Sequence, residues 1–564
     1  MRALCRPQGR LWKRGRNLRT RASGMRSVVV DGGGLSEKKV CLSTPLFYVN
    51  APPHLGGAYT AMATDACARH ARRCGMDVLM VTGTDEHGEK IARAAETAGQ
   101  PPQQHCDQVV KQYRQLWEML DVKYDRFVRT TEEKHEKMVQ DAVQKVWDQG
   151  DVYKSSYRGK YCVGCEEYKD EKELEEGDLC PLHKTVCEDR EEENYFFRLS
   201  KYEKDIQQLV DSKDFVQPEY RKNEVSQWVS QGVRDFSISR AAVEWGIPMK
   251  QDPSQTLYVW FDALLGYVSA LLEPDDEPTL ENALQKGYFP YNVHIIGKDI
   301  LRFHAVYWPG MLMSMGLPLP RMVFGHGFLT KDGLKMSKSL GNTLDPQRLV
   351  SLYGSDAVRY YFLREFEFGR DGDFQHDRFI NIVNAGLAND LGNLLNRSLN
   401  LLKKNCSSEL PLSSADIVTE HPLRLETEAS VRRAHEAFEH LRFNEVCAAA
   451  AALSGHGNQY IDEVAPWKLL KSEDPEDIAK AHVCLVSILE SLRILAVILY
   501  PITPRLAQKV YVQLGIDDDV SGSNWDDATK WGTLLQGHRL PKPVPVFARL
   551  EEQSLEEKES SVVA

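Results

Sequence analysis

The sequence lacks the features that would place the protein in a membrane or on the secretory route. Its longest apolar stretch, 484–500, is interrupted by Glu490 and Arg493 at helical spacing, so it predicts a bundle helix rather than a bilayer span. The first 26 residues have no continuous apolar core of the kind that a secretory signal requires. The twelve cysteines are scattered without an even framework, which favours reduced thiols over disulfides. We therefore expect no membrane partner.

The start of the chain lacks acidic residues and is strongly basic. Residues 1–26 hold nine Lys or Arg and no Asp or Glu, a composition typical of an organellar transit peptide, which we place at 1–37. Mitochondrial and chloroplast signals share this composition, so delivery to either or both stays open, as does Met25 as the true start. The alternative is a solvated basic tail that touches RNA. Without the nine basic residues the formal net charge falls from −11 to −20, so any RNA contact must use local basic patches.

The pattern of apolar residues predicts an α/β protein of three or four domains. A buried strand at 40–49, a helix at 57–73 and a strand at 78–82 followed by a glycine loop indicate a doubly wound parallel sheet, whose ligands bind at the carboxyl ends of its strands. An irregular, cysteine-rich segment interrupts this pattern, which returns at 256–261 and 292–297. Long helical stretches from about 372 to 514 indicate a bundle. The expected boundaries are 38–150 and 256–325 for the split sheet domain, 151–255 for the insertion, 326–375 for a region that holds a lysine-rich loop, 376–540 for the bundle and 541–564 for a strand-like return and charged tail.

The insertion contains two ligand pairs at knuckle spacing. Cys162 and Cys165 form one pair, and Cys180 and His183 form the other about fourteen residues later. Three thiolates and an imidazole are a closed tetrahedral set that suits a structural Zn²⁺. A redox Cys-x-x-Cys motif is the alternative, and Cys187 is a spare thiol that could replace Cys180 or His183.

Two short stretches carry features of an anion site. His54 follows a proline turn at a predicted helix start, where an imidazole and backbone N–H groups suit phosphate and Gly56 permits close approach. Far downstream, Lys335 and Lys338 lie in a polar loop between glycines, where mobile ammonium groups can stabilise charge that develops on transferring phosphates. Read singly, a structural histidine and a solvated lysine loop are the simpler interpretations.

In this order the two stretches resemble the signatures of the class I aminoacyl-tRNA synthetases, with Gly57 standing where that family usually has a second histidine. Over nearly the whole chain after residue 38 the sequence is similar to the methionyl-tRNA synthetases of bacterial and organellar type. The landmarks that carry this resemblance are Tyr48-Val-Asn50, Thr82-Gly-Thr-Asp85-Glu-His87-Gly88, the cysteine pairs, Glu193-Asn194-Tyr195, Asp235-Phe-Ser237-Ile-Ser239-Arg240, Trp245-Gly-Ile-Pro248, Tyr258-Val-Trp260-Phe-Asp262-Ala263, Ile296-Gly-Lys298-Asp299, Phe303-His304, Lys335 to Ser339 and Ala465-Pro-Trp467. The resemblance implies a Rossmann-type parallel sheet split by a zinc-containing insertion and followed by an α-helical anticodon-binding bundle.

The resemblance also implies site residues. For methionine they are Leu46, Asp85, Trp260, Ala263, Tyr267, Ile300 and His304. For ATP, which brings Mg²⁺, they are His54, Gly56, Gly57, Gly297, Lys298, Asp299, Lys335 and Lys338, of which His54, Lys335 and Lys338 are expected to be catalytic. Asp85 can pair with the substrate ammonium, and aromatic faces beside a small Ala263 suit a flexible thioether. Taken singly, each of these residues could simply pack in the core, and Asp262 could cap its helix.

For tRNA(Met) the resemblance implies anticodon contacts from Asn389, Asn393, Arg397 and Trp467. The first three recur at i, i+4 and i+8, which predicts one helix face, and Trp467 could stack on an unpaired base. The absence of an extra C-terminal module favours a monomer. The expected activity is ATP-dependent charging of tRNA(Met) with L-methionine in an organelle. Two rivals remain: a weakened, tRNA-binding paralogue, because of Gly57, and a related synthetase for another amino acid.

Overall fold

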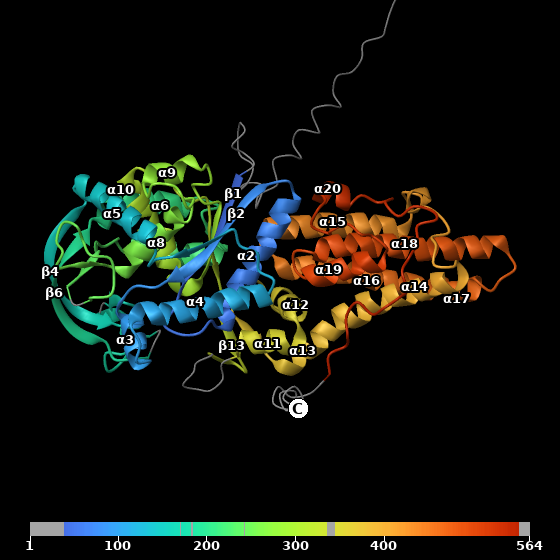
Figure 1. The fold of residues 1–564 in the computed structure, drawn as a ribbon, viewed down its shortest axis with the longest axis horizontal. Coiled ribbons are helices and arrows are strands. Elements are labelled where there is room, and N and C mark those ends of the chain that lie inside the picture. Colours follow the sequence, from blue (N-terminus) through green and yellow to red (C-terminus); the bar gives the residue numbers. More distant parts are fainter. Residues whose placement is uncertain (1–38, 170, 182–183, 242, 336–343, 552–564) are drawn as a thin grey trace, which may run out of the picture.

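The computed structural model describes residues 39–169, 171–181, 184–241, 243–335 and 344–551. Three predictions fall outside these ranges: the basic segment at 1–37, His183, and the lysine loop from Met336 through Lys338 to Gly341. The chain forms two lobes along its long axis, one of mixed sheet and helix and one almost wholly helical, as Figure 1 shows.

The first lobe is built on a six-stranded parallel sheet, which confirms the doubly wound α/β prediction. The strand order is β3-β2-β1-β11-β12-β7, so the order reverses direction beside β1. The strands are β1 (Lys39–Tyr48), β2 (Asp77–Asp85), β3 (Arg126–Arg129), β7 (Val216–Gln217), β11 (Val293–Gly297) and β12 (Val323–His326). In such sheets ligands bind outside the carboxyl ends of the strands at the reversal point, and here those ends are Tyr48, Asp85 and Gly297.

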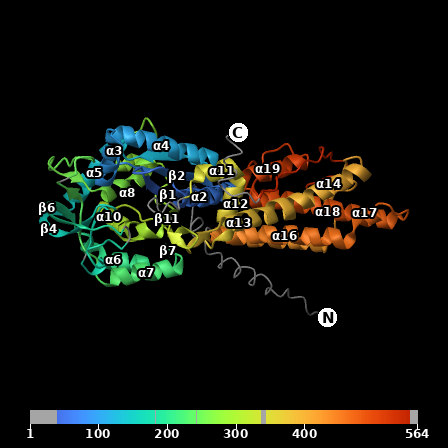
Figure 2. The ribbon, with the colours of Figure 1, turned by 90° about the horizontal axis from the view of Figure 1, so that it is seen from below.

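Helices cover both faces of the sheet and enclose two apolar cores. One face carries α2 (Leu55–Arg73) and α4 (Pro102–Met119), with α3 (Glu89–Thr97) packed on α4. The other face carries α5 (Glu133–Asp148), α8 (Val259–Ser269), α9 (Leu280–Gln285) and α10 (Trp308–Met315). Figure 2 shows α4 and α6 (Glu203–Asp211) on opposite sides of the sheet.

The segment after α5 forms an antiparallel sheet of its own, in the order β5-β4-β6-β8. Its elements are β4 (Val152–Cys162), β5 (Glu167–Lys169), β6 (Glu188–Phe197), α6 (Glu203–Asp211), α7 (Glu219–Ser230) and β8 (Phe236–Ser237). One short strand of the segment, β7, leaves this sheet and extends the parallel sheet beside β12.

The stretch 256–261 differs from its predicted strand character. Only Thr256–Leu257 (β10) is a strand, and it pairs with β9 (Ser239–Arg240) rather than with the parallel sheet. The chain then enters helix α8, every residue of which is buried. With no polar face the helix shows no 3.6-residue period, and its Val, Trp and Phe residues favour a strand reading.

The second lobe is the helical bundle that the sequence predicts. It contains α11 (Pro346–Tyr353), α12 (Ser355–Glu365), α13 (His376–Val383), the π-helix η7 (Asn384–Asn393), α14 (Leu394–Asn405), α15 (Pro422–Glu439), α16 (Phe443–Val464), α17 (Pro466–Leu469), α18 (Pro475–Leu499), α19 (Pro504–Gln513) and α20 (Trp525–Ala528). Between the lobes lies a small sheet of β13 (Leu329–Lys331), β14 (Leu334–Lys335) and β15 (Gly372–Phe374). Residues 541–547, expected to be strand-like, form no strand: 541–545 are irregular and 546–547 form a bend.

Helix α18 is the centre of the bundle. By length and composition it alone among the described helices could cross a membrane, but 89% of its apolar window is buried inside the protein. Glu490 and Arg493 form a buried ion pair of 2.8 Å, and Glu490 also accepts hydrogen bonds from the backbone N–H groups of Gly532 and Thr533. The charges that break the apolar run therefore anchor the segment after α20.

Buried charges also join the two lobes. Arg359 of α12 pairs with Asp65 of α2 at 2.6 Å, and Arg69 of α2 holds the same carboxylate at 2.8 Å. Arg359 donates further hydrogen bonds to the carbonyls of Pro501 and Ile502. Because an unpaired buried charge is costly, this network fixes how α2 sits against the bundle.

Candidate functional site

The carboxyl end of β2 presents an acidic side chain with an unused oxygen. Asp85 is 2% exposed, and its Oδ1 has no hydrogen-bond partner among the described residues. Burial raises the pKa of its carboxyl well above the ordinary value, and the charges of Asp262 and Glu166 raise it further. A buried, unsatisfied carboxyl oxygen is the feature expected of a group that awaits a cationic ligand.

One face of α8 supplies three of the residues assigned to a methionine pocket. Trp260, Ala263 and Tyr267 recur at i, i+3 and i+7, so they share a face, and all three are buried. The Trp260 ring stacks on Phe303 with centroids 3.8 Å apart, and it meets Tyr48 edge-on at 6.1 Å. The indole Nε1 has no partner among the described residues.

A polar pair lies within this aromatic surface. His304, in the π-helix η5 (Phe303–Tyr307), donates from Nδ1 to the Ile300 carbonyl at 3.0 Å. Its Nε2 therefore accepts from the Tyr267 hydroxyl at 2.8 Å. Burial lowers the pKa of His304 to about 4, so the ring is neutral at physiological pH. Burial also raises the pKa of Tyr267, to which the nearby charge of Asp85 contributes.

The two aliphatic residues of the predicted pocket are half-buried. Leu46, near the carboxyl end of β1, lies against α8, where a Cβ on Gly266 would approach the Leu46 Cδ1 to 2.4 Å. Gly266 is thus the residue that admits Leu46. Ile300, in the 3₁₀ turn η4 (Lys298–Ile300), contributes the carbonyl that orients His304. These residues therefore combine an acid, aromatic rings and a neutral polar pair, a set that suits a small ligand with an ammonium group and an apolar side chain.

Asp262 does not cap α8, as the sequence allowed. The helix begins after Tyr258, and Asp262 instead accepts hydrogen bonds from His87 at 2.7 Å and His135 at 2.5 Å. Although burial alone would raise it, these two imidazoles hold the pKa of Asp262 below its ordinary value. His135 was missed by the sequence reading, since nothing local marks it, whereas His87 lies in the quoted motif after Asp85.

The predicted phosphate side of the site is partly described. His54 is exposed and caps α2, with its Nδ1 accepting from the backbone N–H of Gly56 at 3.1 Å. Lys298 forms an ion pair of 2.7 Å with Asp371. Asp299 is exposed and follows Gly297 at the end of β11. Lys335 ends β14, but its side chain and all of Lys338 lie outside the described residues.

Gly57 is closely packed. A Cβ at this position would lie 3.1 Å from Cε1 of Phe47, and Phe47 stacks on Tyr113 at 5.4 Å and meets Trp117 edge-on at 5.5 Å. The backbone of Gly57 is in an ordinary helical conformation. A side chain here would therefore require the Phe47 ring to shift by a few tenths of an ångström within this aromatic cluster.

Three of the four predicted metal ligands come together. The Sγ atoms of Cys162, Cys165 and Cys180 all lie within 4.8 Å of one another, and the Cys165 and Cys180 sulfurs are 3.6 Å apart. That separation is close to the edge, about 3.8 Å, of a tetrahedron with Zn–S bonds of about 2.3 Å. Cys187 is buried beside this group, and the fourth predicted ligand, His183, is outside the described residues.

Residues predicted to read an anticodon lie near the far end of the bundle. Asn389 and Asn393 are exposed in the π-helix η7, and Arg397 follows in α14. Arg397 lies over the Trp467 ring at 5.5 Å and pairs with Asp462 at 2.7 Å. The structure thus brings Arg397 and Trp467 together from separate helices.

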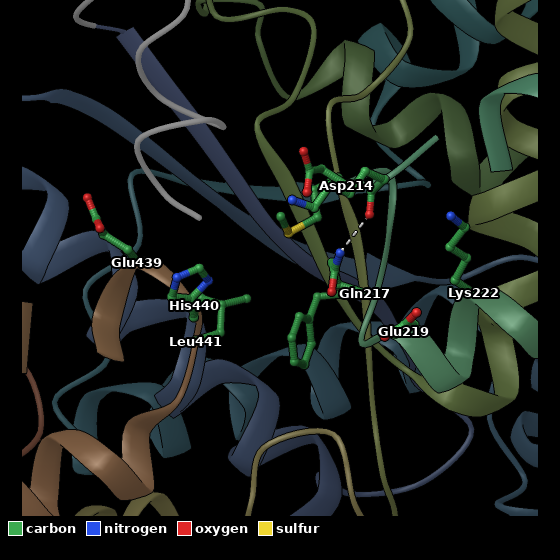
Figure 3. Close-up of a pocket in the computed structure, with 10 residues that line it drawn as sticks. Asp214, Gln217, Glu219, Lys222, Glu439, His440 and Leu441 are labelled. Atoms are coloured by element: carbon green, nitrogen blue, oxygen red, sulfur yellow. Dashed lines mark hydrogen bonds between the residues drawn. The ribbon is translucent and has the colours of Figure 1, made fainter. Parts of the chain in front are cut away.

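The described chain also contains hollows outside the predicted pocket. One of about 310 Å³ lies between β7, α7 and the turn that joins α15 to α16, and Figure 3 shows Asp214, Lys222 and His440 around it. None of the predicted site residues lines it. Another hollow, of about 320 Å³, borders Lys298 and Asp299.

Family models match both lobes of the chain. The model described as "tRNA synthetases class I (M)" matches residues 40–188 and 171–399. The model described as "Anticodon binding domain of methionyl tRNA ligase" matches residues 410–562.

Relatives of known name match over almost the full length. "Methionine--tRNA ligase, chloroplastic/mitochondrial" of Arabidopsis thaliana is 54% identical over 528 residues, which is 92% of this chain and 85% of the relative. "Methionine--tRNA ligase" of Nostoc sp. is 52% identical and covers 92% of this chain and 98% of the relative. Among solved structures, Mycobacterium tuberculosis methionyl-tRNA synthetase in complex with methionyl-adenylate superposes with a TM-score of 0.85 at 37% identity, covering 91% of this chain and 100% of that one. The chain belongs to the methionyl-tRNA synthetases, a family of the class I tRNA synthetases.

Proposed function

We propose that this protein is a methionine–tRNA ligase that activates L-methionine with ATP and transfers it to tRNA(Met). The observation that carries the proposal is the buried Asp85, whose Oδ1 has no hydrogen-bond partner among the described residues and whose charge acts on Tyr267, the partner of His304. This arrangement suits an amino acid with an uncharged, polarisable side chain. The family match supports the same substrate.

The reaction has two steps. A carboxylate oxygen of methionine forms a bond to the α-phosphorus of ATP, and the bond from that phosphorus to the bridging oxygen breaks, which releases pyrophosphate. A ribose hydroxyl of the terminal tRNA adenosine then attacks the carbonyl carbon, loses its proton and displaces AMP. No protein nucleophile is needed, so the chain contributes by holding the reactants and stabilising charge.

In the first step Asp85 orients methionine through its ammonium group, and α8 with His304 surrounds the thioether. The ATP side is assigned to His54, the backbone of Gly56, Gly57 and Gly297, the pair Lys298 and Asp299, and the lysines Lys335 and Lys338. His54 is supported in this role by its place at the exposed start of α2, where N–H groups favour an anion. Mg²⁺ bound with ATP would neutralise phosphate charge.

The residues of the insertion fit a structural zinc ion. Cys162, Cys165 and Cys180 would hold it, with His183 as the proposed fourth ligand, and the short sulfur separations support this set. A closed set of four protein ligands leaves no position for substrate, so the ion would pin the turn after β4.

The bundle is proposed to bind the tRNA(Met) anticodon through Asn389, Asn393, Arg397 and Trp467. Contact of Arg397 with the Trp467 ring supports a platform on which an unpaired base can stack.

We also propose delivery of the protein to mitochondria, chloroplasts or both. The basic composition of residues 1–26 and the name of the Arabidopsis relative support this proposal.

Amino-acid-dependent ATP–pyrophosphate exchange on the purified protein tests the proposal. We expect exchange with methionine and only background exchange with leucine, isoleucine, valine and cysteine. Exchange with none of them would favour the weakened paralogue, the alternative suggested by Gly57 in place of the second signature histidine. Preferential exchange with another amino acid would favour the related synthetase.

A further inference from the structure

A second group of metal-ligating side chains lies where the two lobes meet. His70 and Cys74, at the end of α2, face His435 of α15, and their three ligand atoms all lie within 4.8 Å of one another. The contact is made near the carboxyl end of α15, and Figure 1 shows α15 extending away from α2 along the helical lobe. The group is separate in sequence and in fold from the cysteines of the insertion, and neither the pocket nor the bundle surface uses it.

Two of the three separations in this group match those between ligands of one zinc ion. His70 Nε2 is 3.2 Å from His435 Nδ1 and 3.5 Å from Cys74 Sγ. Zn–N bonds of about 2.0–2.1 Å and Zn–S bonds of about 2.3 Å in a tetrahedron give ligand separations of about 3.3 Å and about 3.6 Å. Two imidazoles and a thiolate are also a donor set that zinc prefers.

The surroundings are those of a metal site rather than of a solvated surface cluster. His70 is 1% exposed and stacks on Phe438, with ring centroids 4.2 Å apart, while Trp525 packs edge-on at 4.7 Å. The other nitrogen of His435, Nε2, lies 3.7 Å from the buried Glu439 carboxylate. A carboxylate behind a ligating histidine fixes the ring and raises its basicity.

We propose that His70, Cys74 and His435 bind a Zn²⁺ ion that ties the catalytic lobe to the helical lobe. On binding, Cys74 releases its thiol proton to solvent and two neutral imidazole nitrogens donate their lone pairs. Three protein ligands leave the fourth position to water. Because the ligands come from α2 and α15, the bound ion stabilises the junction that Asp65 and Arg359 also hold.

Zinc content per chain tests this proposal by difference. The full-length protein and its variants are dialysed against buffered Zn²⁺, and metal is measured by mass spectrometry against protein concentration. His435→Asn and Cys74→Ser should each contain about one zinc fewer than the wild type. His440→Asn is the matched control, because His440 follows α15 by one residue and is not among the three ligands. Cys162→Ser reports on the zinc site of the insertion. The double variant with Cys162→Ser and His435→Asn should lose the sum of the zinc that the two single variants lose.

A second measurement keeps the test independent of folding yield. When Co²⁺ replaces Zn²⁺, Cys74→Ser should lose part of the thiolate-to-cobalt charge-transfer absorption while retaining the circular dichroism of the wild type. The same zinc content in the wild type, His435→Asn and Cys74→Ser would overturn the proposal. So would zinc that a weak chelator removes equally from all three proteins.

Discussion

Replacing Asp85 by asparagine is expected to weaken methionine binding while stabilising the free protein. The carboxyl group is buried, and its Oδ1 has no hydrogen-bond partner in the part of the chain that the structure describes. Burial, and then the charges of Asp262 and Glu166, raise its pKa well above the ordinary range. In the empty site an ionised Asp85 is therefore unfavourable. The substrate ammonium is the group that offsets this cost.

The structure gives the size and sign of both effects. Removing one partner from a buried ion pair costs about 3–5 kcal/mol, which corresponds to a loss of about 150- to 5,000-fold in affinity. For the free protein, a raised carboxyl pKa stabilises the fold fully below the unfolded value of about 3.9. That stabilisation is lost as pH rises through the raised value. Asp85→Asn removes this dependence, so its melting temperature should exceed that of the wild type by a margin that grows above about pH 4.

Calorimetric titration with methionine and thermal unfolding between pH 4 and 8 measure the two effects. The hydroxy acid that replaces the methionine ammonium by a hydroxyl should bind the wild type weakly, and Asp85→Asn should lose little more. Asp77→Asn is the control, because Asp77 lies exposed at the other end of β2 and accepts a hydrogen bond from Tyr288. Methionine affinity within about threefold of the wild type, or a variant less stable than the wild type at pH 7, would refute the reasoning.

Three further changes probe the rest of the site. Gly57→His should destabilise the protein by about 1–3 kcal/mol without raising exchange activity, because its Cβ would lie 3.1 Å from the Phe47 ring; urea unfolding and exchange rates check this, and a faster variant of full stability would contradict it. Tyr267→Phe removes the hydroxyl that donates to His304 and should raise the KM for methionine by about 3- to 10-fold. Since His304 has a pKa of about 4, this ring should add no pH dependence to wild-type methionine binding from pH 5.5 to 8 and should weaken binding as pH falls towards 4; methionine titrations from pH 8 to 4 check this. Trp467→Ala should raise the KM for tRNA by about 5- to 150-fold, the size of one stacking contact, and leave exchange unchanged; equal losses in both assays would exclude an RNA role.

The sheet could be predicted because its strands are buried on both faces. The apolar runs of β1 and β2, with a proline turn and a glycine loop after them, define the strands, and Asp85 stands out as an acid at a strand end. Helix α8 could not be predicted in the same way. Burial of every residue in Val259–Ser269 removes the polar face that would reveal a helical period.

Contacts between elements that are distant in the sequence could not be predicted from the sequence alone. Asp262 accepts hydrogen bonds from His87 and His135, which lie in other parts of the sequence. Only the folded chain shows that the charge of Asp262 also raises the pKa of Asp85. The π-helices that hold His304 and Asn389 have no clear sequence signal either. In contrast, the thiols of Cys162, Cys165 and Cys180 lie together in the structure, and the two-residue gap between Cys162 and Cys165 already indicates one tight turn.

Aminoacylation tests the central claim most directly. The purified protein is given radiolabelled methionine, ATP and Mg²⁺ with tRNA(Met) carrying its CAU anticodon, or with the same tRNA carrying a changed anticodon. We predict ATP-dependent charging of the first tRNA and at least about 10²-fold less efficient charging of the second, as several lost base contacts of about 1–3 kcal/mol each would produce. A protein that binds tRNA(Met) but attaches no methionine to it would contradict the account.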